Sequence, residues 1–256
     1  MRSVVLNGTL LDATQASIPI TDRGFLFGEG VFTSMRVQEG QIWAFDHHCR
    51  RLARQSEAVG LQVRPLLRDD CQRLLDANGC HHGLWRLKVL VTPAIQLLTV
   101  EPFVQETQPL RVITYPDPVC GPWQRIKSLA YAERLWLRRW AQDQGFDEVL
   151  TLGPQGEVLE LASSNLFWKL GDRYFTPDPV LPLLKGVCLE LLEEAGVSFT
   201  PIRCRPEDIP PDAQVFACNA VQGVRSVRSI DAATYRCSEP PFSLSDHAGI
   251  VCACSS

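Results

Sequence analysis

The chain has 256 residues, of which 45% are hydrophobic and 21% are charged, and its formal net charge is −4. This composition is typical of a globular protein with one large domain or two modest ones, and it excludes a basic surface for nucleic acid or anionic lipid. The first residues do not form a signal peptide and no apolar run approaches the length of a transmembrane helix, so we expect a cytoplasmic protein without membrane contacts.

The cysteines point to reduced thiols rather than to a metal site. There are ten of them, and none has the CxxC spacing of a zinc site. His47, His48 and Cys49 are adjacent, but neighbours on a helix point about 100° apart and cannot easily bind one ion. The sequence therefore predicts no metal. We interpret the cysteine-rich end, residues 250–256, as a disordered tail with no assigned role.

The first part of the chain mixes strands and helices. Strands are expected where short runs rich in apolar and β-branched residues are bounded by turn residues, which are residues 3–11, 25–45 with a hairpin at 38–40, 84–93 and 110–116. One helix is predicted from Asp46, as its N-cap, to Gly60, and a second from Pro65 to Gly79. This mixture predicts an α+β fold with a mostly antiparallel sheet.

Residues 114–123 are dense in proline and glycine and are predicted to be a linker. The linker divides the chain into an N-terminal lobe, residues 1–113, and a C-terminal lobe, residues 124–256. In the C-terminal lobe, residues 130–145 place apolar side chains at the spacing of an amphipathic helix. The same lobe has strand-like runs at 148–153, 157–171 and 213–221, and a predicted helix at 186–195.

Lysine is rare in this chain, which makes Lys127 a candidate for chemistry. The other lysines are Lys88, Lys169 and Lys185, and arginine supplies the remaining positive charge. Unlike arginine, a lysine amine can lose its proton and attack a carbonyl to form a Schiff base. Lys127 lies where extended backbone gives way to a helix, and an ordinary surface lysine remains the alternative interpretation.

Other residues fit the same chemistry. Glu160 lies in an apolar strand, either facing water at an edge or serving as the partner of a protonated ring nitrogen. The backbone N–H groups of residues 186–188 open a helix and could hold a phosphate, and Arg50 or Arg51 could contact an anion. A Schiff-base lysine, a carboxylate and a phosphate site are together what pyridoxal 5'-phosphate (PLP) requires.

The order of these residues resembles a known family. The runs TDRGFLFGEGVFTSMRV, HHCRRL, IKSLAYAERL, GEVLELASSNLFW, LLKGVC and CNAVQGVRSV are similar to those of the class IV, or fold-type IV, PLP-dependent enzymes. These are branched-chain aminotransferases, D-amino-acid aminotransferases and 4-amino-4-deoxychorismate lyases. The resemblance implies two α/β lobes with the active site between them, PLP as cofactor, a small-molecule substrate and a homodimer.

The resemblance also implies a role for single residues. Lys127 is similar to the lysine that forms the Schiff base, and Glu160 to the partner of the pyridine nitrogen. Arg51 matches the phosphate-binding arginine, and Tyr131 stands near the phenolic oxygen of the cofactor. The two sides of the phosphate site are then Gly186, Val187 and Cys188 on one side and Asn219 and Ala220 on the other.

Smaller features resemble the lyases most. Thr33 follows Phe32 where the aminotransferases typically have glutamate, so Thr33 and Ser34 are expected beside the substrate. We therefore predict a lyase that converts 4-amino-4-deoxychorismate to 4-aminobenzoate and pyruvate for folate synthesis. The alternatives are a branched-chain or D-amino-acid aminotransferase, or a PLP-binding protein without turnover. The lyases carry a Gly- and Arg-rich segment near the substrate's carboxylate, whereas residues 92–102 contain neither residue type, so the carboxylate-binding residues stay unassigned.

Overall fold

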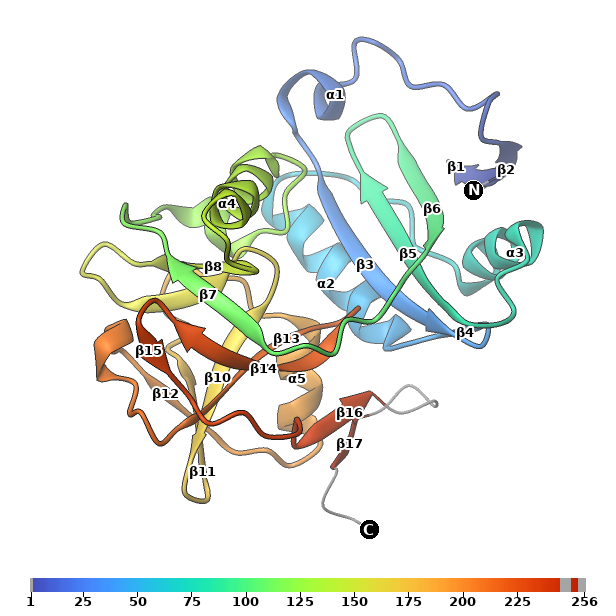
Figure 1. The fold of residues 1–256 in the computed structure, drawn as a ribbon. Helices are drawn as coiled ribbons and strands as arrows, with labels where there is room; N and C mark the ends of the chain where they lie inside the picture. Colours follow the sequence, from blue (N-terminus) through green and yellow to red (C-terminus); the bar gives the residue numbers. More distant parts are fainter. Residues whose placement is uncertain (1, 245–249, 253–256) are drawn as a thin grey trace. The chain divides into compact units, whose positions relative to one another are not determined.

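The computed structural model describes residues 2–244 and 250–252, and their backbone forms two compact units. Unit 1 contains residues 2–105 and 126–131, and unit 2 contains residues 106–125, 132–244 and 250–252. Figure 1 labels the α-helices and most of the strands of both units. None of the described helices is both long enough and apolar enough to cross a lipid bilayer.

Unit 1 is built on a six-stranded sheet in the order β2-β1-β6-β5-β3-β4, in which every neighbouring pair is antiparallel. Its strands are β1 Ser3–Leu6, β2 Thr9–Asp12, β3 Val31–Gln38, β4 Gln41–Ile42, β5 Leu84–Val91 and β6 Gln96–Pro102. Asn7 and Gly8 turn between β1 and β2 with φ values of 50° and 81°, as a tight hairpin requires. The antiparallel sheet expected for the first part of the chain is confirmed.

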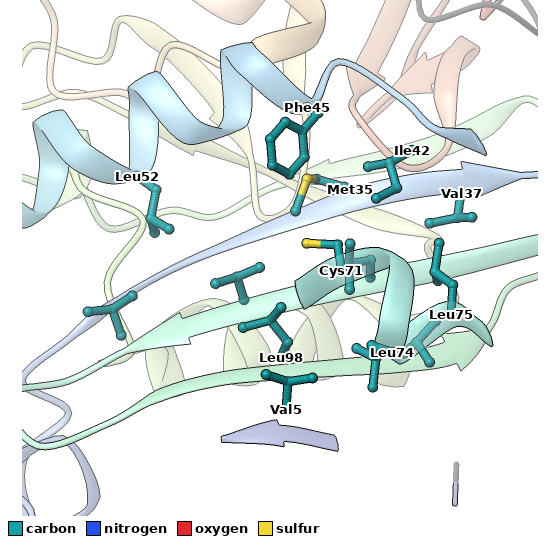
Figure 2. Packing of buried hydrophobic residues seen from close by; sticks show 14 of the residues in the cluster. Val5, Met35, Val37, Ile42, Phe45, Leu52, Cys71, Leu74, Leu75 and Leu98 are labelled. Carbon is teal, nitrogen blue, oxygen red and sulfur yellow. The ribbon is translucent and has the colours of Figure 1, made fainter. Parts of the chain in front are cut away.

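Three helices accompany this sheet: α1 Arg23–Phe27, α2 Phe45–Ala58 and α3 Arg68–Asn78. Because side chains alternate along a strand, Val31, Met35 and Val37 of β3 share one face, and all three are fully buried. They form the core of unit 1 with apolar residues of α2 and α3. Figure 2 shows Phe45 of α2 beside Met35 of β3 in this core.

Several boundaries in unit 1 differ from the sequence prediction. The run 25–45 begins with α1 rather than a strand, because the side chain of Asp22 accepts a hydrogen bond from the Phe25 N–H at 2.9 Å. Helix α2 begins one residue before Asp46, which lies in its first turn. Helix α3 begins at Arg68, beyond the predicted start at Pro65. Strand β6 was not predicted, and it lies between β1 and β5.

Unit 2 is built on a nine-stranded mixed sheet in the order β12-β11-β10-β13-β14-β7-β8-β9, with β15 paired to β14. Its strands are β7 Leu110–Thr114, β8 Glu148–Leu152, β9 Val158–Leu161, β10 Asn165–Leu170, β11 Arg173–Pro177, β12 Phe199–Ile202, β13 Gln214–Asn219, β14 Gly223–Ile230 and β15 Ala233–Thr234. The helices are α4 Ala132–Asp143 and α5 Val187–Glu194, with the 3₁₀ helices η1 Pro122–Arg125 and η2 Pro206–Asp208. The α+β class is confirmed in both units, although the pairs β7–β8, β7–β14 and β11–β12 are parallel.

The observed units do not follow the predicted lobe boundaries. Strand β7, expected in the N-terminal lobe, belongs to unit 2 because it pairs with β8 and β14. Residues 126–131, expected in the C-terminal lobe, belong to unit 1, where the Leu129 N–H donates to the Gly30 carbonyl at 2.9 Å. The predicted linker 114–123 runs along β8 rather than free, since the Val119 N–H donates to the Leu152 carbonyl at 2.8 Å.

Residues 250–252 of the C-terminal segment form a strand, contrary to the sequence interpretation. Residues 250–252 form strand β17, Ile250–Cys252, which pairs with β16, Phe242–Leu244. The last four residues of the predicted tail, 253–256, lie outside the described residues.

Candidate active site

Lys127 lies against β3 in unit 1. Val31 and Ser128 form an antiparallel bridge, and the Phe32 N–H donates to the Lys127 carbonyl at 2.9 Å, so Lys127 is directly opposite Phe32. Opposite residues of an antiparallel pair point to the same face of the sheet. The Lys127 N–H donates to the Oε1 atom of Gln55 on α2 at 3.1 Å. The backbone of Lys127 is therefore fixed on both sides.

Two aromatic rings surround the amine of Lys127. Its Nζ atom lies 4.8 Å from the centroid of the Phe32 ring and 5.7 Å from that of Tyr131. The two rings meet edge to face, with centroids 5.2 Å apart and planes at 88°. Because the side chain is half-buried and in contact with both rings, Lys127 is not an ordinary surface lysine.

Helix α2 presents a row of polar side chains to β3. His48, Arg51 and Gln55 are all buried and share one face of the helix. The Nη2 atom of Arg51 donates to the Oγ1 atom of Thr33 at 2.7 Å, and that oxygen lies 2.7 Å from Nδ1 of His48. Of the two arginines that the sequence left open, Arg51 is 4% exposed, whereas Arg50 faces solvent.

The buried side chains of His48, Arg51 and Thr33 favour the binding of an anion. Burial lowers the pKa of His48 well below its ordinary value, and the positive charges of Arg51 and Lys127 lower it further. His48 is therefore neutral near pH 7. Thr33 accepts from Arg51 and has one proton left to donate to Nδ1, which assigns the ring proton to Nε2. That buried Nε2 atom has no hydrogen-bond partner among the described residues, so the donor set fits a phosphate group.

Thr33 and Ser34 were both expected beside the substrate, but β3 points them in opposite directions. Thr33 is fully buried toward α2, where it bonds to Arg51. Ser34 pairs with Lys88 in β5 and lies on the face that carries Phe32 and Lys127. Only Ser34 shares a sheet face with the candidate reactive amine.

In unit 2 the central residue is Glu160 on β9. It is 4% exposed, so the alternative of a glutamate facing water is wrong. Its Oε1 atom accepts from Nη2 of Arg134 at 2.6 Å and from the Leu184 N–H at 3.3 Å. Its Oε2 atom accepts a long hydrogen bond, 3.4 Å, from Nδ2 of Asn165. Glu160 thus forms a buried ion pair with Arg134.

Asn165 connects Glu160 to the start of α5. Its Oδ1 atom accepts from the Gly186 N–H at 3.0 Å, and its Nδ2 atom donates to the Leu184 carbonyl at 2.6 Å. A Cβ atom on Gly186 would lie 2.3 Å from that Oδ1 atom, so any other residue here would displace the Asn165 side chain. No side chain caps α5, which leaves the N–H groups of Val187 and Cys188 at an open helix N-terminus. Two of the three predicted phosphate donors are therefore available, because Gly186 donates to Asn165.

The second predicted side of the phosphate site is the turn after β13. The Oδ1 atom of Asn219 accepts from the N–H groups of Val221 and Gln222 at 2.9 and 2.8 Å. Its Nδ2 atom donates to Oγ of Ser164 at 3.0 Å. The Asn219 side chain therefore shapes this turn and the path of Ala220.

The sequence analysis missed four residues of these groups: His48, Gln55, Arg134 and Asn165. Arg134 could have been found, because a carboxylate in an apolar strand requires a cationic partner. Asn165 stood inside the motif SSNLFW, but only the structure shows what its side chain bonds. Among the described residues, no group of three or more His, Cys, Asp and Glu side chains could hold a metal ion.

Comparisons with known proteins show the family of the chain. A family model described as amino-transferase class IV matches residues 30–230. D-alanine aminotransferase from Bacillus licheniformis is 25% identical, over 90% of this chain and 89% of its own. Aminodeoxychorismate lyase from Bacillus subtilis strain 168 is 23% identical, over 91% of this chain and 88% of its own.

A solved structure has a fold similar to that of this chain. A hypothetical aminotransferase from Mycobacterium tuberculosis, in its PLP-bound form, superimposes with a TM-score of 0.79 at 18% identity, over 93% of this chain and 94% of its own. The fold-type IV architecture and the PLP cofactor expected from the sequence are thereby confirmed. The chain belongs to the class IV aminotransferase family.

Proposed function

We propose that this enzyme is an aminodeoxychorismate lyase, which converts 4-amino-4-deoxychorismate to 4-aminobenzoate and pyruvate. This proposal rests on one hydrogen bond: Thr33 on β3 accepts from Arg51 at 2.7 Å. A glutamate at this position, as in the aminotransferases that the sequence resembles, would place a carboxylate against Arg51. The neutral hydroxyl of Thr33 adds no negative charge beside Arg51. The lyase from Bacillus subtilis, a relative over most of its length, supports the same activity.

The proposed cofactor contacts follow from the donor sets of each unit. Arg51 binds the phosphate through charge-assisted hydrogen bonds. Glu160 accepts a hydrogen bond from the protonated pyridine nitrogen, and Arg134 holds the carboxylate in place. Further phosphate contacts come from the backbone at Val187, Cys188, Asn219 and Ala220, whereas the Gly186 N–H donates to Asn165. When bound, PLP supplies an electron sink for the carbon that bears the substrate amine.

Lys127 is the proposed catalytic residue. Its Nζ atom holds the cofactor and then takes and returns a proton beside the substrate carbon. Phe32 and Tyr131 restrict the path of this amine, because their rings lie 4.8 and 5.7 Å from Nζ. Loss of the enolpyruvyl group as pyruvate leaves an aromatic ring, which makes the elimination strongly favourable.

The test is a direct assay of the purified protein with 4-amino-4-deoxychorismate. We expect 4-aminobenzoate fluorescence to rise together with pyruvate, which lactate dehydrogenase detects. Lys127→Ala removes both signals, whereas Lys169→Ala, a lysine of unit 2 beside the Tyr174 ring, leaves them unchanged. A PLP-loaded protein that releases no pyruvate would refute the lyase.

A D-amino-acid aminotransferase is the second candidate, because the relative from Bacillus licheniformis matches over 90% of this chain. This activity predicts glutamate formation from D-alanine and 2-oxoglutarate, and a branched-chain donor tests the related aminotransferase. A protein that binds PLP without turnover would show the cofactor's visible band and neither product. We also expect a homodimer in the cytoplasm, and light scattering on the eluted protein measures its mass.

A further inference from the structure

Gln55 is a buried polar residue of α2 to which the proposed function assigns no role. It is 5% exposed and lies four residues after Arg51 and seven after His48, so the three side chains share one face of the helix. Four residues of an α-helix span about 6 Å along its axis. A buried amide group is costly unless it is hydrogen-bonded, so the bonds of Gln55 indicate what this residue does.

Both backbone groups of Lys127 are held within unit 1. The Lys127 N–H donates to Oε1 of Gln55 at 3.1 Å, and the Lys127 carbonyl accepts from the Phe32 N–H at 2.9 Å. The next bond along the segment joins the Leu129 N–H to the Gly30 carbonyl, also at 2.9 Å. The side chain of Gln55 therefore holds the backbone of the proposed catalytic residue directly.

The uncharged amide of Gln55 suits the positive charges near it. Burial lowers the pKa of His48, and the charges of Arg51 and Lys127 lower it further, so both cations lie near this imidazole. A carboxylate at position 55 would bring a negative charge into this group and compete with a phosphate for Arg51. The amide oxygen of a glutamine accepts the Lys127 N–H without adding that charge.

We propose that Gln55 is a positioning residue, which fixes the Lys127 backbone on the helix that also carries Arg51. PLP carries its aldehyde and its phosphate on one ring, so the protein has to match a fixed separation between them. Because α2 is one continuous helix, the acceptor of the Lys127 N–H and the proposed phosphate donor cannot move independently. The tolerance is small, since a displacement of about 1 Å can slow a reaction roughly a hundredfold.

The inference rests on the proposed function, because it takes Lys127 as the residue that holds the cofactor and Arg51 as a phosphate donor. Gln55 acts through Lys127. Its loss should therefore change how fast the amine reacts with PLP, rather than how tightly the site binds an anion. These two quantities can be measured separately.

The first test replaces Gln55 by methionine, which has a similar size and no amide oxygen, and follows amide hydrogen exchange of the cofactor-free protein by NMR. We expect the Lys127 amide to exchange about tenfold faster and the Leu129 amide to keep its rate, because the bond from Leu129 to Gly30 remains. Gln55→Glu keeps an acceptor and should restore slow exchange at Lys127. The matched control is Gln72→Met on the exposed side of α3, which should change neither amide.

The second test mixes the same proteins with PLP and measures how fast the absorbance band of protein-bound PLP develops. Calorimetry with inorganic phosphate measures the affinity for the anion. Gln55→Met should lower the rate about tenfold and leave phosphate affinity unchanged, since Arg51 and His48 remain. Gln55→Glu should weaken phosphate binding about tenfold, because its carboxylate competes for Arg51. With 4-amino-4-deoxychorismate, Gln55→Met should lower kcat roughly tenfold and change KM less than about threefold.

The outcomes separate this inference from the proposed function. An unchanged exchange rate at Lys127 in Gln55→Met overturns the inference, and so does an equal increase at Lys127 and Leu129, because Gln55 would then support the whole segment. An unchanged rate of PLP binding overturns it as well. Failure of the lyase assay in the wild-type protein overturns only the proposed activity, because amide exchange and PLP binding are measured without turnover.

Discussion

Replacing Arg134 by methionine is the most informative perturbation of unit 2, because it leaves Glu160 buried without its cation. The side chains of Arg134 and Glu160 are only 13% and 6% exposed, and the atoms that join them are 2.6 Å apart. Removing one partner of a buried ion pair costs roughly 3–5 kcal/mol. The Arg134 side chain also donates to the Leu161 carbonyl at 3.2 Å and to Gln124 at 2.8 Å, and these bonds are lost as well.

Two remaining donors reduce this penalty. The Leu184 N–H and Nδ2 of Asn165 still reach Glu160 in the variant, at 3.3 and 3.4 Å. We therefore expect Arg134→Met to lower the free energy of unfolding by about 3 kcal/mol, near the lower end of the range for buried pairs. For a protein of this size that corresponds to a fall in Tm of roughly 6–12 °C.

The assay is urea and thermal unfolding of the PLP-free protein, so that loss of cofactor does not contribute. Arg139→Met on the exposed side of α4 is the matched control and should change stability by less than about 0.5 kcal/mol. The double variant Arg134→Met/Glu160→Gln should be more stable than Arg134→Met alone, since it leaves no unpaired charge. A single variant as stable as the control, or additive losses in the double variant, would refute the reasoning.

Three further predictions concern the groups of the proposed cofactor site. Folding lowers the pKa of His48, so the free energy of unfolding should fall as the pH drops below about 6.5, by up to about 1.4 kcal/mol per pH unit. His48→Gln should flatten this dependence, and urea titrations between about pH 5 and about pH 7 measure it. Thr33→Val removes the hydrogen-bond acceptor of Arg51 and should weaken PLP binding about tenfold in absorbance titrations. Ser34→Ala, on the other face of β3, should leave PLP binding unchanged, and equal effects of the two variants would contradict the separation of the two residues. Gly186→Ala brings a Cβ atom within 2.3 Å of Asn165, so we expect a lower Tm and weaker PLP binding, and unchanged values would show that the turn adapts.

Local patterns were sufficient for most helices and strands, but not for every boundary. The apolar run at residues 25–27 was predicted as a strand, although Asp22 and Gly28 bound it as N-cap and C-cap of α1. Both capping residues were visible in the sequence, but the strand prediction relied on the apolar composition of the run. Strand β6 is different, because its place between β1 and β5 is set by pairing with residues far away in sequence.

The candidate site shows the same division between local and non-local information. Alternation along a strand is a local rule, and it alone could have separated Thr33 from Ser34. By contrast, nothing near Lys127 in the sequence indicates that its segment pairs with residues 30–32, about a hundred positions earlier. Sequence order therefore placed Lys127 in the C-terminal lobe, whereas backbone hydrogen bonds place it in unit 1.

Residues 126–131 belong to unit 1 but are synthesised after the first residues of unit 2, which affects the nascent chain. A ribosome completes residues 2–105 before this segment exists, so the edge of β3 at Gly30 and Phe32 stays without its later hydrogen-bond partners during that interval. An unpaired strand edge invites pairing with another chain. The segment that carries Lys127, the proposed catalytic residue, thus also closes this strand edge. The nascent protein acquires this lysine only after residues 2–105, with all six strands of the unit 1 sheet, have been made.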